Sequence, residues 1–310
     1  MQPDSLAVKA VPRPGGSVYR GRFAPSPTGA LHFGSLVAAV GSWLRARQAG
    51  GSWLLRIEDL DPPREIAGAA QQQIATLAAF GMQSDEPIVW QHQRSEAYAA
   101  ALQQLVADDQ AFACWCSRND LLRSNGLHQG PCVAAADPAR TPAWRLRVPD
   151  LCIGFDDGLA GRFEQNLADD VGDFVLRRVE GYYAYQLAVV VDDAWQGISE
   201  IVRGADLLDS TPRQLWLQRQ LGVAQPDYVH LPLALGPDGR KLSKQYAALP
   251  VDAADPLPAL RAALGFLGLP APLLAGAHTP TNLLTAATTR FDLAAIPQLP
   301  ANVHLRHGMS

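Results

Sequence analysis

Residues 22–35 read Arg-Phe-Ala-Pro-Ser-Pro-Thr-Gly-Ala-Leu-His-Phe-Gly-Ser, a stretch with two prolines, two glycines and one histidine. Ahead of it, residues 18–23 are predicted to form a short strand. Behind it, apolar residues recur at helical spacing from Leu36 to Leu44, and the pattern stops at Gly50. The sequence therefore predicts a turn from a strand into a helix.

This turn is a candidate phosphate-binding site. Backbone amides at the start of a helix favour negative charge, and Gly29 and Gly34 allow another group to come close to the backbone. His32 lies where it offers a hydrogen-bond donor to a phosphate oxygen. The alternative is an ordinary strand-to-helix turn with an incidental histidine, and the turn alone leaves both interpretations open.

Length and composition describe a globular protein with more than one lobe. The chain has 310 residues, 48% of them hydrophobic and 18% charged. No apolar run is long enough to span a membrane, and the polar first residues lack the apolar core of a signal peptide. We expect residues 1–17 to be a disordered lead into a cytoplasmic protein. The net charge of -4 argues against broad non-specific binding of nucleic acid but allows a local basic face.

The first third of the chain alternates strands and helices. A strand over residues 52–57 ends in Glu58, Asp59 and Asp61, at the sheet edge where α/β proteins bind ligands. A helix is predicted from Pro62 to Gly81. The alternative interpretation of the three acidic residues is that they cap this helix. An extended segment over 87–90 and a helix from Ser95 follow. This order predicts half of a parallel, doubly wound sheet.

The next segment breaks this pattern and carries a candidate metal site. Cys114, Cys116, His128 and Cys132 have the spacing Cys-x-Cys-x11-His-x3-Cys, which suits a tetrahedral structural zinc ion. The alternative is a surface loop with three free thiols. The fourth cysteine, Cys152, is interpreted as a small buried apolar residue.

Strand-like segments return at residues 174–176 and 182–191, and residues 201–206 resemble a strand end that bears Arg203. A helix over 211–222 and a strand over 228–235 follow. A glycine turn then leads into Arg240-Lys241-Leu242-Ser243-Lys244-Gln245, which is either a phosphate-gripping loop or a solvated surface loop. The remaining residues contain predicted helices over 257–269 and 281–291.

Four segments in this order resemble the class I aminoacyl-tRNA synthetases, in the form used by glutamyl enzymes. Residues 25–34 resemble their first signature and residues 241–245 their second, the lysine loop. Residues 56–64 and 201–206 also look like glutamyl-type segments. The resemblance implies a Rossmann-like α/β fold with a doubly wound parallel sheet. Residues 18–110 and 173–245 would form its two halves, 111–172 an inserted zinc-knuckle subdomain, and 246–310 a small helical C-terminal region.

The resemblance also implies the chemistry. The enzyme would activate L-glutamate with ATP, carried with Mg²⁺, by attack of the α-carboxylate on the α-phosphate. The implied glutamate-binding residues are Arg22, Phe23, Ala24, Pro25, Ser26, Glu58, Tyr185 and Arg203. Arg22 is the best candidate for a bidentate clamp on the side-chain carboxylate, and Glu58 would pair with the ammonium. ATP and its leaving group would be held by His32, Gly34, Ser35 and Lys244, with help from Lys241. Ser35 departs from the second histidine of many class I enzymes, so a second imidazole contact is not expected.

The resemblance ends near Gln245, where a glutamyl-tRNA synthetase would continue into an anticodon-binding region. We therefore expect no such domain. The short tail and the Cys-x-Cys knuckle resemble a paralogous group that transfers glutamate, activated without tRNA, to the queuosine base in the anticodon of tRNA(Asp). Two alternatives remain, a compact enzyme that charges a tRNA 3′ end and a non-catalytic adaptor that binds tRNA or protein. No membrane association and no stable protein partner are expected.

Overall fold

The structure, a computed structural model, describes residues 18–124, 126–233 and 251–297. The strands are β1 (Arg20–Phe23), β2 (Ser52–Ile57), β3 (Val89–Trp90), β4 (Ala111–Cys114), β5 (Ala143–Leu146), β6 (Cys152–Asp157), β7 (Gly161–Asn166), β8 (Phe174–Arg177), β9 (Glu200–Gly204) and β10 (Asp227–Leu231). The α-helices are α1 (Phe33–Gln48), α2 (Ala69–Ala79), α3 (Ser95–Ala107), α4 (Leu167–Asp170), α5 (Tyr185–Trp195), α6 (Thr211–Leu221), α7 (Pro256–Phe266) and α8 (Pro280–Thr288). Residues 1–17, for which disorder was predicted, lie outside the described ranges.

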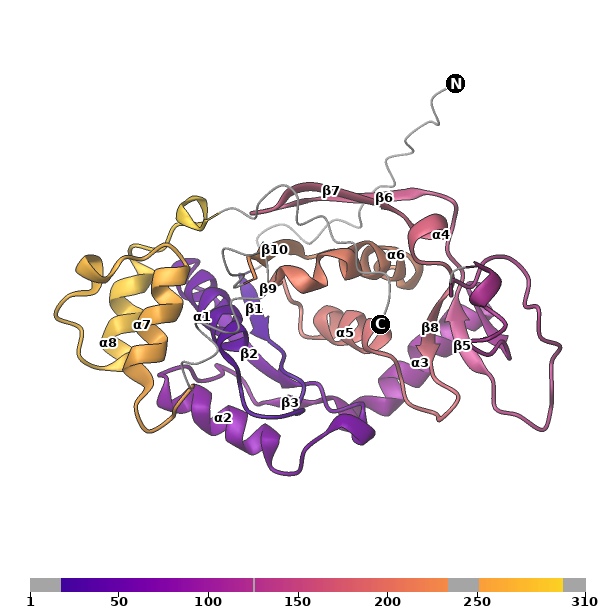
Figure 1. The fold of residues 1–310 in the computed structure, drawn as a ribbon, viewed down its shortest axis with the longest axis horizontal. Helices are drawn as coiled ribbons and strands as arrows, with labels where there is room; N and C mark the ends of the chain where they lie inside the picture. The colour runs from indigo at the N-terminus through magenta and orange to yellow at the C-terminus, as the bar shows by residue number, and fades with distance from the viewer. Residues whose placement is uncertain (1–17, 125, 234–250, 298–310) are drawn as a thin grey trace, which may run out of the picture.

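Parallel strands form the centre of the molecule (Figure 1). β1 pairs with β2 and β2 with β3, while β9 pairs with β10, all in parallel register. The two sets meet where β9 lies beside β1, and Ser199 N donates to Arg20 O at 2.9 Å. The order in space is therefore β3-β2-β1-β9-β10, and the predicted doubly wound parallel arrangement is confirmed.

Helix α1 packs on this sheet and forms the centre of the main hydrophobic core. Leu36 and Val40 are fully buried against strand residues such as Trp53. Gly41 lets the helix come close to β10, because a Cβ atom there would lie 2.6 Å from Leu231 Cδ1. Helices α7 and α8, coloured orange to yellow in Figure 1, extend the same core on the outer side of α1. They correspond to the two helices predicted near the end of the chain.

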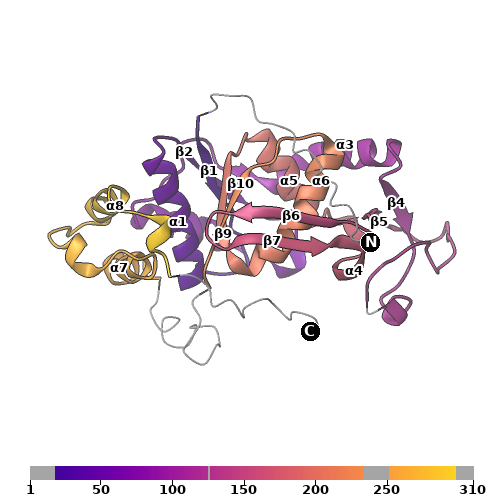
Figure 2. The same cartoon turned by 90° about the horizontal axis from the view of Figure 1, so that it is seen from above.

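The segment between the two halves of the sheet forms separate β structure. β4, β5 and β8 make an antiparallel sheet, and β6 and β7 make a long hairpin. Figure 2 shows that this hairpin runs back from the antiparallel sheet toward β9 and β10. The inserted segment therefore contacts the central sheet through this hairpin, far from the cysteine and histidine residues of the predicted zinc knuckle.

Two predictions of secondary structure differ from the structure, and the reason in each case is tertiary packing or backbone geometry. Residues 182–191 were predicted as a strand, but Tyr185–Trp195 is helix α5. The helix buries Leu187 to Val190 against α3 and α6 and carries Asp193 to buried arginines, which outweighs the strand preference of the valine run. The helix predicted from Pro62 to Gly81 begins later than expected: Pro62–Arg64 is a 3₁₀ turn that ends at the extended Glu65, and α2 begins only after Gly68, whose φ is +80°.

The prediction that Cys152 is buried is also wrong, because its side chain is exposed at the start of β6.

No helix within the described ranges is both long enough and apolar enough to cross a bilayer.

Candidate active site and metal cluster

A cavity of about 740 Å³ opens at the carboxyl ends of β1 and β9. It brings together residues that are far apart in the sequence. The predicted site residues that line it are Arg22, Phe23, Ala24, Pro25, Ser26, His32, Gly34, Ser35, Glu58, Tyr185 and Arg203. Lys241 and Lys244 lie outside the described residues; the wall of the cavity includes Leu233, the last described residue before them.

The turn before α1 forms one wall, and His32 fixes its shape. His32 is the N-cap of the helix, where its Nδ1 accepts a hydrogen bond from Ser35 N at 3.2 Å. The neutral ring therefore carries its proton on Nε2, which remains a donor. Gly34 makes room for the ring, since a Cβ atom there would lie 3.1 Å from His32 Cε1. Gln73, from α2, holds the loop by donating to Ser26 O and Gly29 O.

Arg22 is a buried cation that already has a partner. Its Nε and Nη2 donate to the two carboxylate oxygens of Asp193 at 3.1 and 3.4 Å, and its side chain is 4% exposed. Arg56 Nη1 donates to the same Asp193 at 2.8 Å. Burial alone raises the pKa of Asp193, but the two guanidinium groups outweigh it and hold the pKa below its ordinary value. The pair lies between two halves of the chain and ties them together.

Arg203 is a buried cation of a different kind, because its recorded hydrogen bonds all go to neutral groups. Nε donates to His230 Nε2 at 3.0 Å, Nη2 to Thr211 Oγ1 at 2.8 Å, and Nη1 to Tyr185 Oη at 3.4 Å. Nη2 also lies 3.3 Å from Leu207 O. No described carboxylate forms a salt bridge with it, although it is only 4% exposed. Because buried charges are usually paired, such a cation is able to accept an anionic ligand through charge-assisted hydrogen bonds.

Glu58 supplies a buried carboxylate to the cavity. Its Oε1 lies 3.3 Å from Arg56 Nη2, and its backbone N donates to Pro25 O at 3.0 Å. Burial raises the pKa of Glu58, and the guanidinium groups of Arg56 and Arg22 oppose this shift without cancelling it. A ligand ammonium at this position would stabilise the ionised carboxylate.

Cys114, Cys116, His128 and Cys132 form the predicted cluster. One ligand atom from each residue lies within 4.8 Å of the others. His128 is 2% exposed; its Nδ1 lies 2.9 Å from Asp173 Oδ2, while its Nε2 lies 3.5 Å from Cys132 Sγ. Asp173 thus orients the ring as carboxylates orient metal-bound histidines. Cys152 is not part of the cluster.

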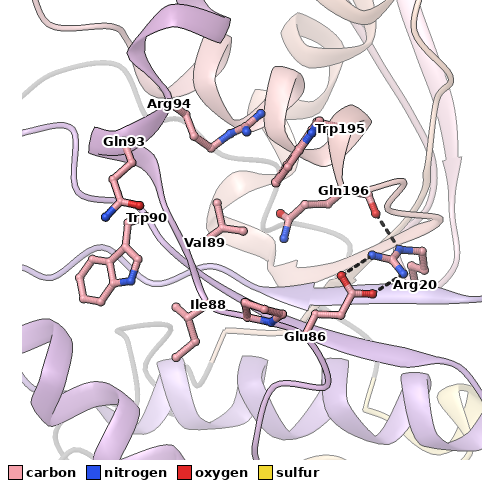
Figure 3. Close-up of a pocket in the computed structure, with 10 residues that line it drawn as sticks. Arg20, Glu86, Ile88, Val89, Trp90, Gln93, Arg94, Trp195 and Gln196 are labelled. Carbon is pink, nitrogen blue, oxygen red and sulfur yellow. Dashed lines mark hydrogen bonds and ion pairs between the residues drawn. The ribbon is translucent and has the colours of Figure 1, made fainter.

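A second cavity of about 440 Å³ lies between β3, the 3₁₀ turn just before α3 and the end of α5 (Figure 3). Arg20 pairs with Glu86 on one side of it, and Arg94 lies over the ring of Trp195 on the other. It shares no lining residue with the first cavity within the described ranges. Gln196 connects the two regions, because its Oε1 accepts from the Arg56 that also holds Asp193.

Sequence reasoning missed the groups behind the first cavity. Asp193 comes just after residues 182–191, which were predicted as a strand, and neither Asp193 nor His230 nor Asp157 was singled out. The signal for His230 is its place in Tyr228-Val229-His230-Leu231, where alternation puts it on the side of the strand that bears Tyr228. The sequence carries no comparable signal for Asp157, since Asp156 beside it is equally acidic.

Comparisons with known proteins agree with this arrangement. The family described as "tRNA synthetases class I (E and Q), catalytic domain" matches residues 19–140 and 135–268. A protein of Xanthomonas oryzae pv. oryzae named "Glutamyl-Q tRNA(Asp) synthetase" is 57% identical over 281 residues, which cover 90% of this chain and 93% of that protein. A protein of the same name from Pseudomonas putida (strain F1) is 52% identical over 285 residues, covering 91% and 94%.

A solved structure supports the fold. The glutamate tRNA ligase from Elizabethkingia meningosepticum, crystallised in complex with its amino acid, superimposes with a TM-score of 0.76 at 24% identity. The match covers 91% of this chain and 66% of that one, so the chain spans slightly less than two thirds of the solved structure. The chain belongs to the class I tRNA synthetases of the glutamyl and glutaminyl type, a family of ligases, and within it to the glutamyl-Q tRNA(Asp) synthetases.

Proposed function

We propose that the protein activates L-glutamate with ATP, without needing tRNA, and then transfers the glutamyl group to the queuosine base in the anticodon of tRNA(Asp). The observation that carries this proposal is the pairing of charges in the first cavity. Arg203 is a buried cation with neutral partners, and Glu58 is a carboxylate with a raised pKa in the same cavity. Glutamate carries the complementary charges, because its side-chain carboxylate is negative and its ammonium group is positive.

In this proposal Arg203 receives the side-chain carboxylate of glutamate. Arg22 contributes its Nη1 to the same group, because Nε and Nη2 are occupied by Asp193. Glu58 receives the α-ammonium, and residues 23–26 form the wall beside it. The side-chain carboxylate and the ammonium group of glutamate would therefore each meet a group of opposite charge in the cavity.

Activation needs positioning and charge neutralisation rather than removal of a proton, since the attacking carboxylate is already an anion. Its oxygen bonds to the α-phosphorus of ATP, and the bond to the pyrophosphate oxygen breaks. His32 would donate from Nε2 to a phosphate oxygen, beside the amides at the start of α1. Lys244 and Lys241 would hold the leaving pyrophosphate together with Mg²⁺.

Transfer follows by attack of a hydroxyl group of the queuosine base on the carbonyl carbon of glutamyl-adenylate. An ester bond forms, the mixed anhydride bond to phosphate breaks, and AMP leaves. The name that the relatives from Xanthomonas and Pseudomonas share supports this acceptor.

The test uses radiolabelled glutamate, ATP, the full chain and total tRNA from cells with and without queuosine. We expect label only on queuosine-bearing tRNA(Asp), and label that persists after periodate oxidation of the 3′ end. Label that requires an intact 3′ end on tRNA(Glu) would instead make the protein a compact charging enzyme. Pyrophosphate exchange that fails without tRNA would overturn the tRNA-independent step.

We also propose that the cysteine–histidine cluster holds one structural zinc ion. Tetrahedral zinc with ordinary bond lengths separates a sulfur from a nitrogen ligand by about 3.5 Å, and Cys132 Sγ lies 3.5 Å from His128 Nε2. Four protein ligands leave no position for a substrate, which makes the role structural. Metal analysis should find one zinc per chain in the wild type and in Cys152→Ser, whose cysteine lies outside the cluster. It should find none in the double variant Cys114→Ser, His128→Ala; zinc retained there would exclude this ligand set.

A further inference from the structure

Hydrogen bonds connect Arg203 to the buried imidazole of His230, and His230 to the buried carboxylate of Asp157. His230, on β10, lies directly opposite Arg203 of β9 in the parallel register. Its Nε2 accepts from Arg203 Nε at 3.0 Å, and its Nδ1 lies 2.6 Å from Asp157 Oδ2. The side chains of both His230 and Asp157 have no solvent exposure, and neither residue lines the cavity. We propose that Asp157 and His230 are positioning residues that orient Arg203 for the substrate carboxylate; this rests on the proposed binding of glutamate.

The hydrogen bonds fix one tautomer of His230. Arg203 Nε can only donate, so His230 Nε2 must be unprotonated and the ring proton sits on Nδ1, facing Asp157. Asp157 is itself held in place by backbone amides: Leu159 N and Ala160 N donate to its Oδ1 at 2.9 and 2.8 Å. Burial, assisted by the charge of Arg203, lowers the pKa of His230 to about 4 despite its contact with Asp157. The imidazole is therefore neutral at physiological pH.

A neutral ring between Arg203 and Asp157 serves a purpose that a direct carboxylate would not. Asp193 pairs directly with Arg22 and compensates its charge. His230 instead fixes the plane of the Arg203 guanidinium through Nε and leaves the positive charge uncompensated by direct contact. Thr211 holds Nη2, so two of the three nitrogens are anchored away from the incoming carboxylate. His230 and Thr211 thus orient the guanidinium of Arg203, while its positive charge remains available to a substrate carboxylate.

The carboxylate comes from the inserted segment of the chain. Asp157 ends β6, and the hairpin is tied to β10 by Gly158 N, which donates to Tyr228 O at 2.8 Å. Phe155 packs its ring against those of Tyr228 and His230. Figure 2 shows β6 and β7 running toward β9 and β10. The hairpin belongs to the inserted segment, and through Asp157 it also supports the proposed amino-acid site.

The experiment measures glutamate-dependent ATP–pyrophosphate exchange in His230→Gln and Asp157→Asn. We expect the KM for glutamate to rise about 10- to 100-fold while the KM for ATP stays within about twofold, as loss of one oriented charged hydrogen bond predicts. Asp156→Asn is the matched control, because Asp156 is the exposed neighbour on the same hairpin; its KM values should equal those of the wild type. A purely structural role would reduce the amount of active enzyme and leave the KM for glutamate unchanged, which would overturn the proposal.

A second measurement does not depend on the variants. In wild-type protein labelled with ¹⁵N-histidine, one of the seven histidines besides the proposed zinc ligand His128 should be neutral at pH 5.5, with its proton on Nδ1. No such histidine signal, in a folded protein, would overturn the proposal even if both variants fail to fold. If the wild type shows no glutamate-dependent exchange at all, the proposed function fails, whereas the labelling result still reports the tautomer.

Discussion

Replacing Arg203 with Gln tests the charge argument most directly. The guanidinium is 4% exposed and its hydrogen bonds go to neutral groups, so the substitution removes a buried cation that no described carboxylate contacts directly. Truncating one partner of a buried charged pair costs about 3–4 kcal/mol. At about 1.4 kcal/mol per factor of ten, kcat/KM for glutamate should fall by about 10² to 10³.

The assay is ATP–pyrophosphate exchange with varied glutamate, and the same series with glutamine. We expect the preference for glutamate over glutamine to fall along with kcat/KM, because a neutral side chain loses less when the cation is removed. Arg219→Gln is the control, since Arg219 is a partly buried arginine of α6 that does not line the cavity. A folded Arg203→Gln enzyme within about fivefold of the wild type, or an equal loss in the control, would refute the reasoning.

Three further predictions address other groups. His32→Ala and Lys244→Ala should each reduce ATP–pyrophosphate exchange by a factor on the order of 100, because each removes one preorganised donor. The control is His278→Ala, since His278 is exposed near α8, and its exchange should equal that of the wild type. Near-normal exchange in both His32→Ala and Lys244→Ala would contradict the assigned phosphate site. Because burial raises the pKa of Glu58, the KM for glutamate should rise as the pH falls toward 5, and Glu58→Gln should raise it at neutral pH and abolish this pH dependence. The free energy of unfolding should decrease by up to about 3 kcal/mol between pH 6.5 and 4, and this decrease should shrink in His230→Gln, as measured by urea unfolding.

The sign of the last prediction follows from proton binding. The pKa of His230 is about 4 in the folded protein against an ordinary 6.5, so between these values the unfolded chain takes up a proton that the folded chain does not. Acid therefore favours unfolding in this window. The charged groups that act on His230 are Asp157, Arg203 and Asp206. Asp157 has a lowered pKa, so its own loss of stability comes at lower pH than this window. An equal pH dependence in the wild type and His230→Gln would contradict this assignment.

Much of the fold could be predicted because local signals and global structure agree. The turn at residues 22–35, the strand over 52–57 and the helix over 211–222 each have a clear period and a clear end, and all three are confirmed. The prediction was wrong where long-range contacts decide. The valine run of α5 has a strand preference, and only burial against α3 and α6 makes it helical.

The candidate site was predictable in its residues but not in its electrostatics. The sequence favours Arg22 as the bidentate clamp on the side-chain carboxylate, but in the structure two of its three guanidinium nitrogens are held by Asp193. The difference between Arg22 and Arg203 depends on which group lies behind each one, Asp193 or His230, and these partners are 171 and 27 residues away. No local pattern encodes such a pairing. The roles of the site residues remain predictions that the variants above would test.

The pairing of Arg22 with Asp193 has a consequence for how the substrate preference of such a protein can evolve. Asp193 also holds Arg56, so a mutation of Arg22 unbalances a buried cluster that joins β1, β2 and α5, and it endangers the fold along with the site. Arg203 is surrounded by neutral partners, so its replacement leaves no buried carboxylate unpaired. A lineage that comes to accept a different amino acid therefore has an open mutational route at Arg203 and a closed one at Arg22.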